Sequence, residues 1–289
     1  MKSRRSKHLL RRFGLWFMVA LICFYMLFPV WWTIISSLKS QAQLQMMPAT
    51  MLPRNPVTGA IQFYFKNYLH VITDPAFLRG LFNSCIVAGS STLIALCIGA
   101  FSGFAIGKLR FKGKKVSMYT ILVMSMFPAV SLLSGLYAIM NEIHAPPLIS
   151  LILVYQISVL PLTTWFLAAF FRNLPTELLQ SAQVDGATPM QTFWHILLPL
   201  TAPALVTTGI LAFTGAWNEY LYALTFTTID KSARTVPVAI ALFSGVVAKQ
   251  QPFGEILAAS IIVSVPIIIL VLIFQNRIIG GLTSGSVKG

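Results

Sequence analysis

Six apolar stretches, each of about 20 residues or more, dominate this sequence of 289 residues. A helix needs about 20 such residues to cross the hydrocarbon core of a bilayer. Only 10% of the residues are charged, whereas an ordinary soluble domain has about a quarter. So few charges cannot cover the surface of a soluble protein of this length. We therefore predict an all-α membrane protein with six transmembrane helices.

The predicted spans and the links between them account for the whole chain. We expect the first span to be retained, because it is too long for a signal peptide and no small-x-small cleavage site follows it. An apolar patch at 236–247 is too short to cross and is expected to form an outer helix or a re-entrant piece. In order, the predicted segments are a basic tail (1–13), a first span (14–38), an extracytoplasmic loop (39–80), three spans (81–107, 116–140 and 147–171), a cytoplasmic loop (172–202), a fifth span (203–226), an extracytoplasmic segment (227–255), a sixth span (256–276) and a C-terminal tail (277–289).

The uneven charge of the chain indicates which links are cytoplasmic. The sequence has 21 Lys and Arg against 7 Asp and Glu, a formal net charge of +14. Six basic residues lie in the N-terminal tail and five in the short link at 108–115. Because cytoplasmic loops collect Lys and Arg, both ends of a six-span chain are predicted to be cytoplasmic. A nucleic-acid partner would need a soluble basic face, so we expect none.

The sequence lacks the motifs of a membrane-embedded enzyme or a nucleotide site. It has no His-Glu-x-x-His, no Gly-x-Ser-x-Gly and no Walker-type loop, and no histidine has a second histidine or a cysteine at helical spacing. Ion-driven carriers keep several ionisable residues in their spans, but here only Glu219 lies within one. We expect a passive conduit without a cofactor or metal, whose energy comes from elsewhere.

The cytoplasmic loop at 172–202 carries the signals of two short helices joined by a fixed turn. Pro175 suits the first turn of the first helix, and Gly186 suits the left-handed position that ends it. Thr188 and Gln191 form a T-x-x-Q capping box for the second helix, which Pro199 is expected to stop.

Several side chains of this loop are too apolar for a cytoplasmic linker. Such exposed groups mark either a contact with a partner or an interfacial helix that rests on lipid headgroups. Helical spacing alone does not decide between these two interpretations. The side chains are Leu178, Leu179, Val184, Met190, Phe193 and Trp194.

The spacing of the loop resembles the EAA motif of ABC importer permeases. That motif reads Glu-Ala-Ala, three residues, Gly, nine residues and then Ile-x-Leu-Pro. Every spacing is kept here, but Gln and Ser replace the leading Glu and the first Ala, so a charged contact becomes a neutral hydrogen bond. Glu177, three residues earlier, is a candidate substitute. The matching residues are Gln180, Ser181, Ala182, Gly186, Ile196, Leu198 and Pro199.

Other motifs resemble the carbohydrate-uptake branch of these permeases, the MalG-like maltose and trehalose group. The run Asp-Gly-Ala-Thr-Pro at 185–189 and the run Ala-Trp-Asn-Glu-Tyr at 216–220 are typical of it, and the ending at 281–289 is similar to that of maltose-type permeases. Asn83-Ser84 and Met126-Phe127-Pro128 add to a likeness that covers nearly the whole chain.

The resemblance implies the transmembrane domain of a type I ABC importer in the inner membrane of a bacterium or archaeon. Such a chain is not an enzyme; it forms half of a pore with a second, MalF-like permease in the lipid bilayer. Two ATP-binding cassette subunits carry the ATP and Mg²⁺, and an extracytoplasmic sugar-binding protein delivers the cargo. The cytoplasmic loop would dock on an ATPase subunit through the seven matching residues together with Asp185, Ala187, Thr188 and Pro189.

Candidates for the substrate path lie mostly in the fifth span. Trp217, Asn218, Glu219 and Tyr220 offer aromatic faces and hydrogen-bonding groups, but 217 and 220 share a helix face and 218 lies about 100° away, so only some can face a pore. Neighbouring helices could instead satisfy the polar ones. Asn83, Met126 and Tyr137 are weaker candidates.

The C-terminal tail has two interpretations. A short glycine-rich end is commonly frayed, whereas the resemblance implies that the tail reaches the ATPase interface. The tail residues concerned are Ser284, Gly285 and Lys288.

The expected cargo is a di- or oligosaccharide, such as an α-glucoside of the maltose or trehalose type. A permease for glycerol phosphate or another organic solute is the alternative within the family, although a phosphate would favour Arg or Lys inside the spans, and none is there. An ion-coupled carrier, a stand-alone channel and a membrane-anchored scaffold are the alternatives outside it. None of these three alternatives outside the family needs a loop at 172–202 that docks on an ATPase.

Overall fold

The computed structural model describes residues 2–243 and 252–283, which form helices joined by short links and one isolated β-bridge between Arg54 and Ile61. The chain divides into two compact units. The first comprises Met1–Asp74 with Leu242–Ser264, and the second comprises Pro75–Ala241 with Val265–Gly289.

The first unit holds α1 (Lys2–Ser37), α2 (Gln41–Leu44), α3 (Lys66–Thr73) and the start of α14 (Phe253–Thr283). The second holds the rest of α14 and the long helices α4 (Pro75–Lys108), α7 (Pro147–Asn173) and α11 (Ala202–Trp217). Its shorter elements are α5 (Lys114–Ser125), α6 (Ala129–Glu142), α8 (Glu177–Val184), α9 (Pro189–Thr192), the π-helix η1 (Phe193–Leu197), α10 (Leu198–Leu200), α12 (Leu221–Phe226), η2 (Lys231–Ala233) and α13 (Val236–Ala241).

Among the described residues, four helices are long and apolar enough to cross a membrane: Arg12–Ser37, Pro75–Lys108, Pro147–Asn173 and Phe253–Gln275. Two bent pairs also qualify if each is counted as one span. The pair α5 and α6 bends by 95°, and the segment Pro189–Leu200 meets Ala202–Trp217 at 74°. The chain therefore has four to six candidate spans.

Two of the expected spans are interrupted in the structure. The expected span at 116–140 is broken between α5 and α6, where Pro128 adopts an extended conformation with ψ 129°. Proline disfavours helical geometry at the residue before it, which explains the break. The expected span at 203–226 ends as a helix at Trp217 and resumes as α12 only at Leu221.

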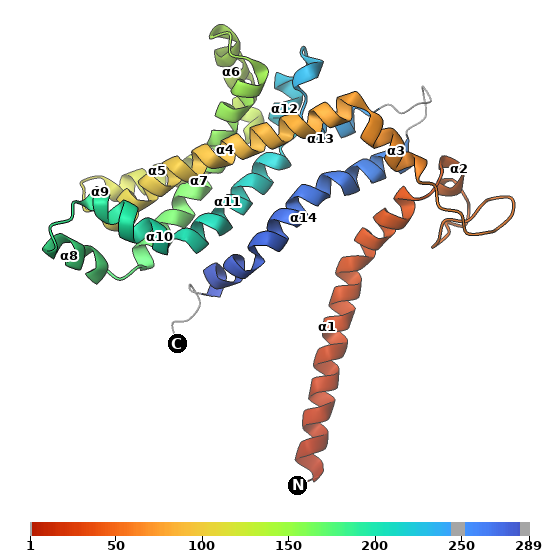
Figure 1. Cartoon of the computed structure of the whole chain (residues 1–289), viewed down its shortest axis with the longest axis horizontal. Coiled ribbons are helices and arrows are strands. Elements are labelled where there is room, and N and C mark those ends of the chain that lie inside the picture. Colours follow the sequence, from red (N-terminus) through yellow and green to blue (C-terminus); the bar gives the residue numbers. More distant parts are fainter. Residues whose placement is uncertain (1, 244–251, 284–289) are drawn as a thin grey trace. The chain divides into compact units, whose positions relative to one another are not determined.

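The second unit is built around α4, which packs along α7 and α11 (Figure 1). Three glycines of α4 at four-residue spacing, Gly99, Gly103 and Gly107, face α7. A Cβ atom at Gly103 would lie 2.9 Å from the Cβ atom of Leu167 and 3.0 Å from the backbone nitrogen of Ala168. Small residues at this spacing let two membrane helices approach closely, so the glycines set the distance between α4 and α7.

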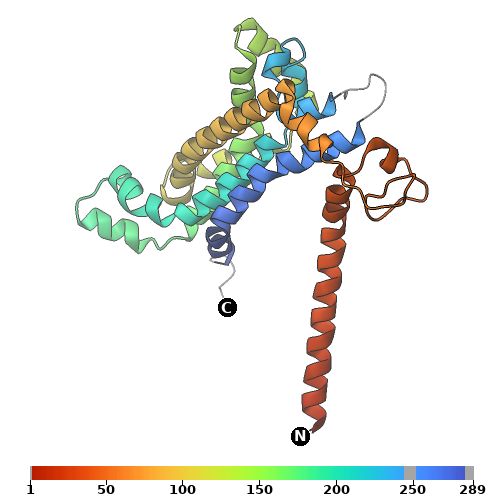
Figure 2. The same ribbon diagram turned by 45° about the vertical axis from the view of Figure 1, so that its right-hand side comes forward.

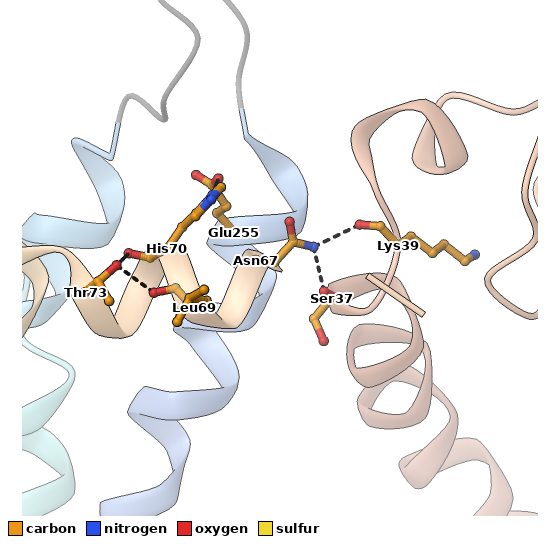
Figure 3. A network of polar contacts seen from close by, with 7 residues as sticks. All are labelled: Ser37, Lys39, Asn67, Leu69, His70, Thr73 and Glu255. Carbon is orange, nitrogen blue, oxygen red and sulfur yellow. Dashed lines mark hydrogen bonds and ion pairs between the residues drawn. The ribbon is translucent and has the colours of Figure 1, made fainter. Parts of the chain in front are cut away.

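The first unit is held by polar contacts between α3, α14 and the segment after α1 (Figure 3). The Asn67 amide donates to the carbonyl oxygens of Ser37 at 2.7 Å and Lys39 at 2.9 Å. His70 Nδ1 lies 2.8 Å from Glu255 Oε1. These contacts fix the end of α1 and the start of α14 to the short helix α3.

Candidate functional site

The loop at 172–202 folds into the helix–turn–helix that its sequence predicts. Helix α8 ends at Val184, and Gly186 takes a left-handed conformation with φ 81°. The Ala187 N–H donates to the carbonyl oxygen of Ala182 at 2.8 Å, closing the cap. A Cβ atom at Gly186 would meet nothing within 4 Å, so the backbone conformation, and not space, requires glycine here.

The predicted capping box at the start of α9 is present. The Gln191 N–H donates to the Thr188 hydroxyl oxygen at 3.3 Å, and the Thr188 N–H donates to Gln191 Oε1 at 2.8 Å. Pro189 occupies the first turn, where a missing N–H costs nothing. The turn between α8 and α9 is therefore fixed on both sides.

Replacing Thr188 with valine should loosen this turn, because the side chain keeps its shape but loses the capping oxygen. Loss of an N-cap costs about 1 kcal/mol, and in a helix as short as α9 this should fray the whole element. If the loop couples an ATPase to a pore, as the EAA resemblance implies, ATP-driven solute uptake by the reconstituted complex should fall about fivefold. Thr188→Ser, which keeps the oxygen, is the matched control and should stay near wild type; equal uptake by both variants would show that the box is dispensable.

The helical run that begins with α9 ends at Leu200, one residue after Pro199. The chain continues through the π-helix η1 and α10, and the bend comes at Thr201. A π-turn widens the helix, and Pro199 stands in the first turn of α10, where its missing N–H is tolerated. The buried Thr201 hydroxyl donates to the Leu197 carbonyl oxygen.

The loop has one anchored face and one outward face. Phe193 and Leu197 are fully buried in a cluster with Phe104 of α4 and with Leu167 and Phe171 of α7. The apolar side chains of Val184, Met190 and Trp194 are 87%, 51% and 49% exposed. Both views show α8 and α9 at the end of α7 and α11 (Figures 1 and 2). A rigid apolar surface is thus attached directly to the long helices.

Most of the predicted coupling residues lie on this surface. Ala182 is buried on the inner side of α8, and Ala187, Ile196 and Leu198 are half-buried. Glu177 is exposed three residues before Gln180, on the same side of α8. The exposed coupling residues are Gln180, Ser181, Asp185, Gly186, Thr188, Pro189 and Pro199.

The four candidates at 217–220 have different surroundings. Trp217 is 1% exposed and stacks on Phe213, with ring centroids 5.3 Å apart. The Asn218 amide donates to the Thr214 carbonyl oxygen at 2.9 Å. Glu219 accepts hydrogen bonds from the backbone N–H groups that start α12, at 2.9 and 3.0 Å, and Tyr220 is 40% exposed. Trp217 therefore supports the helix, whereas Glu219 caps the break in it.

Glu219 also lines a cavity of about 510 Å³ between α7 and α11. The cavity wall is mostly apolar, with polar side chains at Tyr155, Ser158, Thr163 and Thr208. The Tyr155 hydroxyl is buried and faces Glu219 across the cavity. Sequence reasoning missed Tyr155 and Ser158, although two polar residues about one turn apart in an apolar helix were a usable signal.

The weaker path candidates lie elsewhere in the second unit. Asn83 is buried, and its amide donates to the carbonyl oxygens of Ser232 and Arg234 at 2.8 and 2.9 Å, so it fastens α4 to the segment around η2. Met126 is 79% exposed at the bend between α5 and α6, and Tyr137 packs on Phe226. Beside Asn83, the Ser84 hydroxyl accepts from the Val236 N–H at 2.8 Å.

The tail residues Ser284, Gly285 and Lys288 lie outside the described residues. Within the described ranges, no group of three or more His, Cys, Asp or Glu residues is placed to hold a metal ion.

Comparison with known proteins matches this chain to permeases of ABC transporters in sequence and in fold. Residues 95–283 match the family described as binding-protein-dependent transport system inner membrane component. The trehalose transport system permease protein SugB of Mycobacterium tuberculosis is 40% identical over 273 residues, covering 93% of this chain and 95% of that protein. The trehalose/maltose transport system permease protein MalG of Thermococcus litoralis is 37% identical over 94% of each. A solved bacterial ABC transporter involved in the import of the acidic polysaccharide alginate shares the fold, with a TM-score of 0.77 at 18% identity over 93% of this chain and 97% of that one.

Proposed function

Because the chain belongs to the family of binding-protein-dependent transport system inner membrane components, we propose that it is the permease subunit of an ATP-driven importer of di- or oligosaccharides. Its relatives are transporter permeases and not enzymes. In this proposal the chain forms half of the pore beside a second, MalF-like permease. Two ATPase subunits that carry ATP and Mg²⁺ drive it, and an extracytoplasmic binding protein supplies the sugar.

The observation that carries the proposal is the outward apolar face of α8 and α9. Its turn is fixed by Gly186 and the Thr188 box, and its inner face is buried against α4 and α7. A rigid element can transmit the motion of a partner to the helices it is packed on. We place this surface in the cytoplasm, from the Lys and Arg of the N-terminal tail and the 108–115 link, and we assign it to the ATPase.

The choice of cargo rests on the relatives and on the α7–α11 cavity. Both compared permeases carry trehalose in their names, one with maltose, which favours an α-glucoside. Among the described residues that line the cavity there is no Lys or Arg, and Glu219 would repel a phosphate. This disfavours the glycerol-phosphate alternative, whereas hydroxyl and carboxylate groups suit the hydroxyls of a sugar.

Uptake by the assembled transporter tests the proposal directly. The complex of both permeases and the ATPase would be reconstituted in proteoliposomes with its binding protein and offered radiolabelled trehalose, maltose, glycerol phosphate and an unrelated amino acid. We expect ATP-dependent uptake of at least one α-linked disaccharide. If glycerol phosphate is the only compound taken up, the proposed sugar cargo is wrong. If this chain supports uptake without the ATPase, the proposed coupling to ATP hydrolysis is wrong.

Tyr155→Phe should weaken sugar passage through the cavity, because it removes the hydroxyl beside Glu219 and leaves the ring. One lost hydrogen bond of about 1 kcal/mol predicts a roughly fivefold lower uptake at limiting sugar, with the ATPase activity unchanged. Tyr119→Phe, at an exposed position in α5 of the same unit, is the control. If both variants transport like wild type, the cavity is not on the sugar path.

A further inference from the structure

A second cavity, of about 330 Å³, lies within the first unit where α1 ends and α14 begins. Trp32 of α1 and Lys39 form part of its wall, with Thr50 from the following loop. Phe253 and Leu257 contribute from the first turns of α14. This cavity is separate from the α7–α11 cavity and from the α8–α9 surface, and the proposed transport function does not use it.

Lys39 is a buried cation in this wall. Only 2% of the residue is exposed, its ammonium group donates to the Thr50 carbonyl oxygen, and the same group lies 4.8 Å from the centre of the Trp32 ring. An ammonium group has three donors, so two remain without a protein acceptor in the described part of the chain. Burial lowers the pKa of Lys39, as expected for a charge removed from water without a counter-charge.

The chain supplies no acid to balance this charge. All seven Asp and Glu residues fall in the described ranges, and none lines the cavity. Glu255, the acid nearest in the fold, is paired with His70. The Thr50 hydroxyl is also buried and unpartnered within those ranges. The cavity therefore offers a positive charge and hydrogen-bond donors to an anionic group from outside the chain.

The position of Lys39 is fixed before any ligand binds. Asn67 holds the backbone at Ser37 and Lys39, and the Lys39 side chain extends away from Asn67 (Figure 3). The next turn is closed by a capping box between Ser40 and Gln43. A site whose donors are held in place does not lose affinity to ordering them on binding.

The cavity lies at the boundary of two candidate spans. One of these ends at Ser37, two residues before Lys39, and the other begins at Phe253 in the cavity wall. Trp31 and Trp32 lie in the last turns of α1, and tryptophan is enriched at membrane–water interfaces. Lipid phosphates lie at this depth, and the apolar part of the wall suits the glycerol region beneath them. We propose that this cavity binds the phosphodiester of a phospholipid headgroup, with Lys39 and Thr50 as its hydrogen-bond donors.

Native mass spectrometry of the purified full chain tests this proposal. The detergent-solubilised protein would be titrated with dihexanoyl-phosphatidylglycerol, with dihexanoylglycerol, which lacks the phosphate, and with inorganic phosphate. We expect one molecule of dihexanoyl-phosphatidylglycerol to bind per chain, with saturation. Lys39→Met should weaken this binding at least about tenfold, because hydrogen bonds that involve charged groups are stronger than neutral ones. Lys39→Arg should keep most of the affinity. Lys66→Met, at an exposed position on α3, should not change it.

A second variant keeps the test decisive if Lys39→Met does not fold. Thr50→Val removes only the orphaned hydroxyl and should lower phosphatidylglycerol binding about threefold. If the wild type, Lys39→Met and Thr50→Val all bind phosphatidylglycerol equally well, the lipid does not bind in this cavity and the proposal is wrong. Equal binding of dihexanoylglycerol would overturn phosphate recognition, and saturation by inorganic phosphate without retention of phosphatidylglycerol would overturn the lipid as its source.

Discussion

Sugar uptake is expected to fall below detection when Gly186 is replaced with proline, while the chain still inserts into the membrane. Proline holds φ near −65° and has no N–H. Gly186 has φ 81°, and its N–H donates to the Gln183 carbonyl oxygen at 3.1 Å. The substitution would therefore reorient α9 relative to α8 and break the coupling surface without touching the packing of α4 and α7. Uptake in proteoliposomes measures the effect, and protease protection in membranes checks insertion.

Gly186→Asn is the matched control for this prediction. Asparagine tolerates the left-handed conformation better than other non-glycine residues, and a Cβ atom at this position meets nothing within 4 Å. This variant should keep most of the uptake. Near-normal transport by Gly186→Pro would mean that the turn does not transmit motion to the pore.

Gly103→Val should destabilise the packing of α4 on α7. The new side chain would press on Leu167 and on the backbone of α7, where the first added atom already comes within 2.9 Å. Overpacking costs about 1–3 kcal/mol, and more where backbone must move. In a chain of this size that corresponds to a fall in Tm of roughly 5 °C or more, measured by thermal unfolding in detergent.

Gly89→Val in the same helix separates this effect from helix propensity. A Cβ atom at Gly89 meets no neighbouring atom within 4 Å, so its variant should unfold close to the wild-type temperature. Equal losses at the two positions would show that glycine in α4 matters for the helix itself and not for its distance from α7.

The features predicted well from the sequence are those that a few neighbouring residues determine. The turn at Gly186 depends on the conformational freedom of glycine, and the Thr188–Gln191 box joins residues three apart. Both are present in the structure. The matches to known permeases also confirm the family that the EAA spacing indicated.

The errors and omissions came from contacts between distant segments. Asn83 is buried and its amide holds the segment around η2 to α4. The sequence did not indicate this role, because the hydrogen-bond partners of Asn83 lie about 150 residues further along the chain. Tyr155 shares a cavity with Glu219, and His70 pairs with Glu255. No local pattern in a single sequence specifies such pairs.

The central claim, that the α8–α9 surface docks on the ATPase, is tested most directly by cross-linking from Val184. This side chain is 87% exposed on the surface, whereas Ile229, 85% exposed, lies between α12 and η2. Each position would be changed to cysteine in a chain whose native cysteines, Cys23, Cys85 and Cys97, are replaced with serine. A short thiol-to-amine cross-linker is then applied to the assembled transporter. We expect Val184→Cys to form an adduct with the ATPase subunit and Ile229→Cys to form none; no ATPase adduct from position 184, or equal adducts from both positions, would contradict the account.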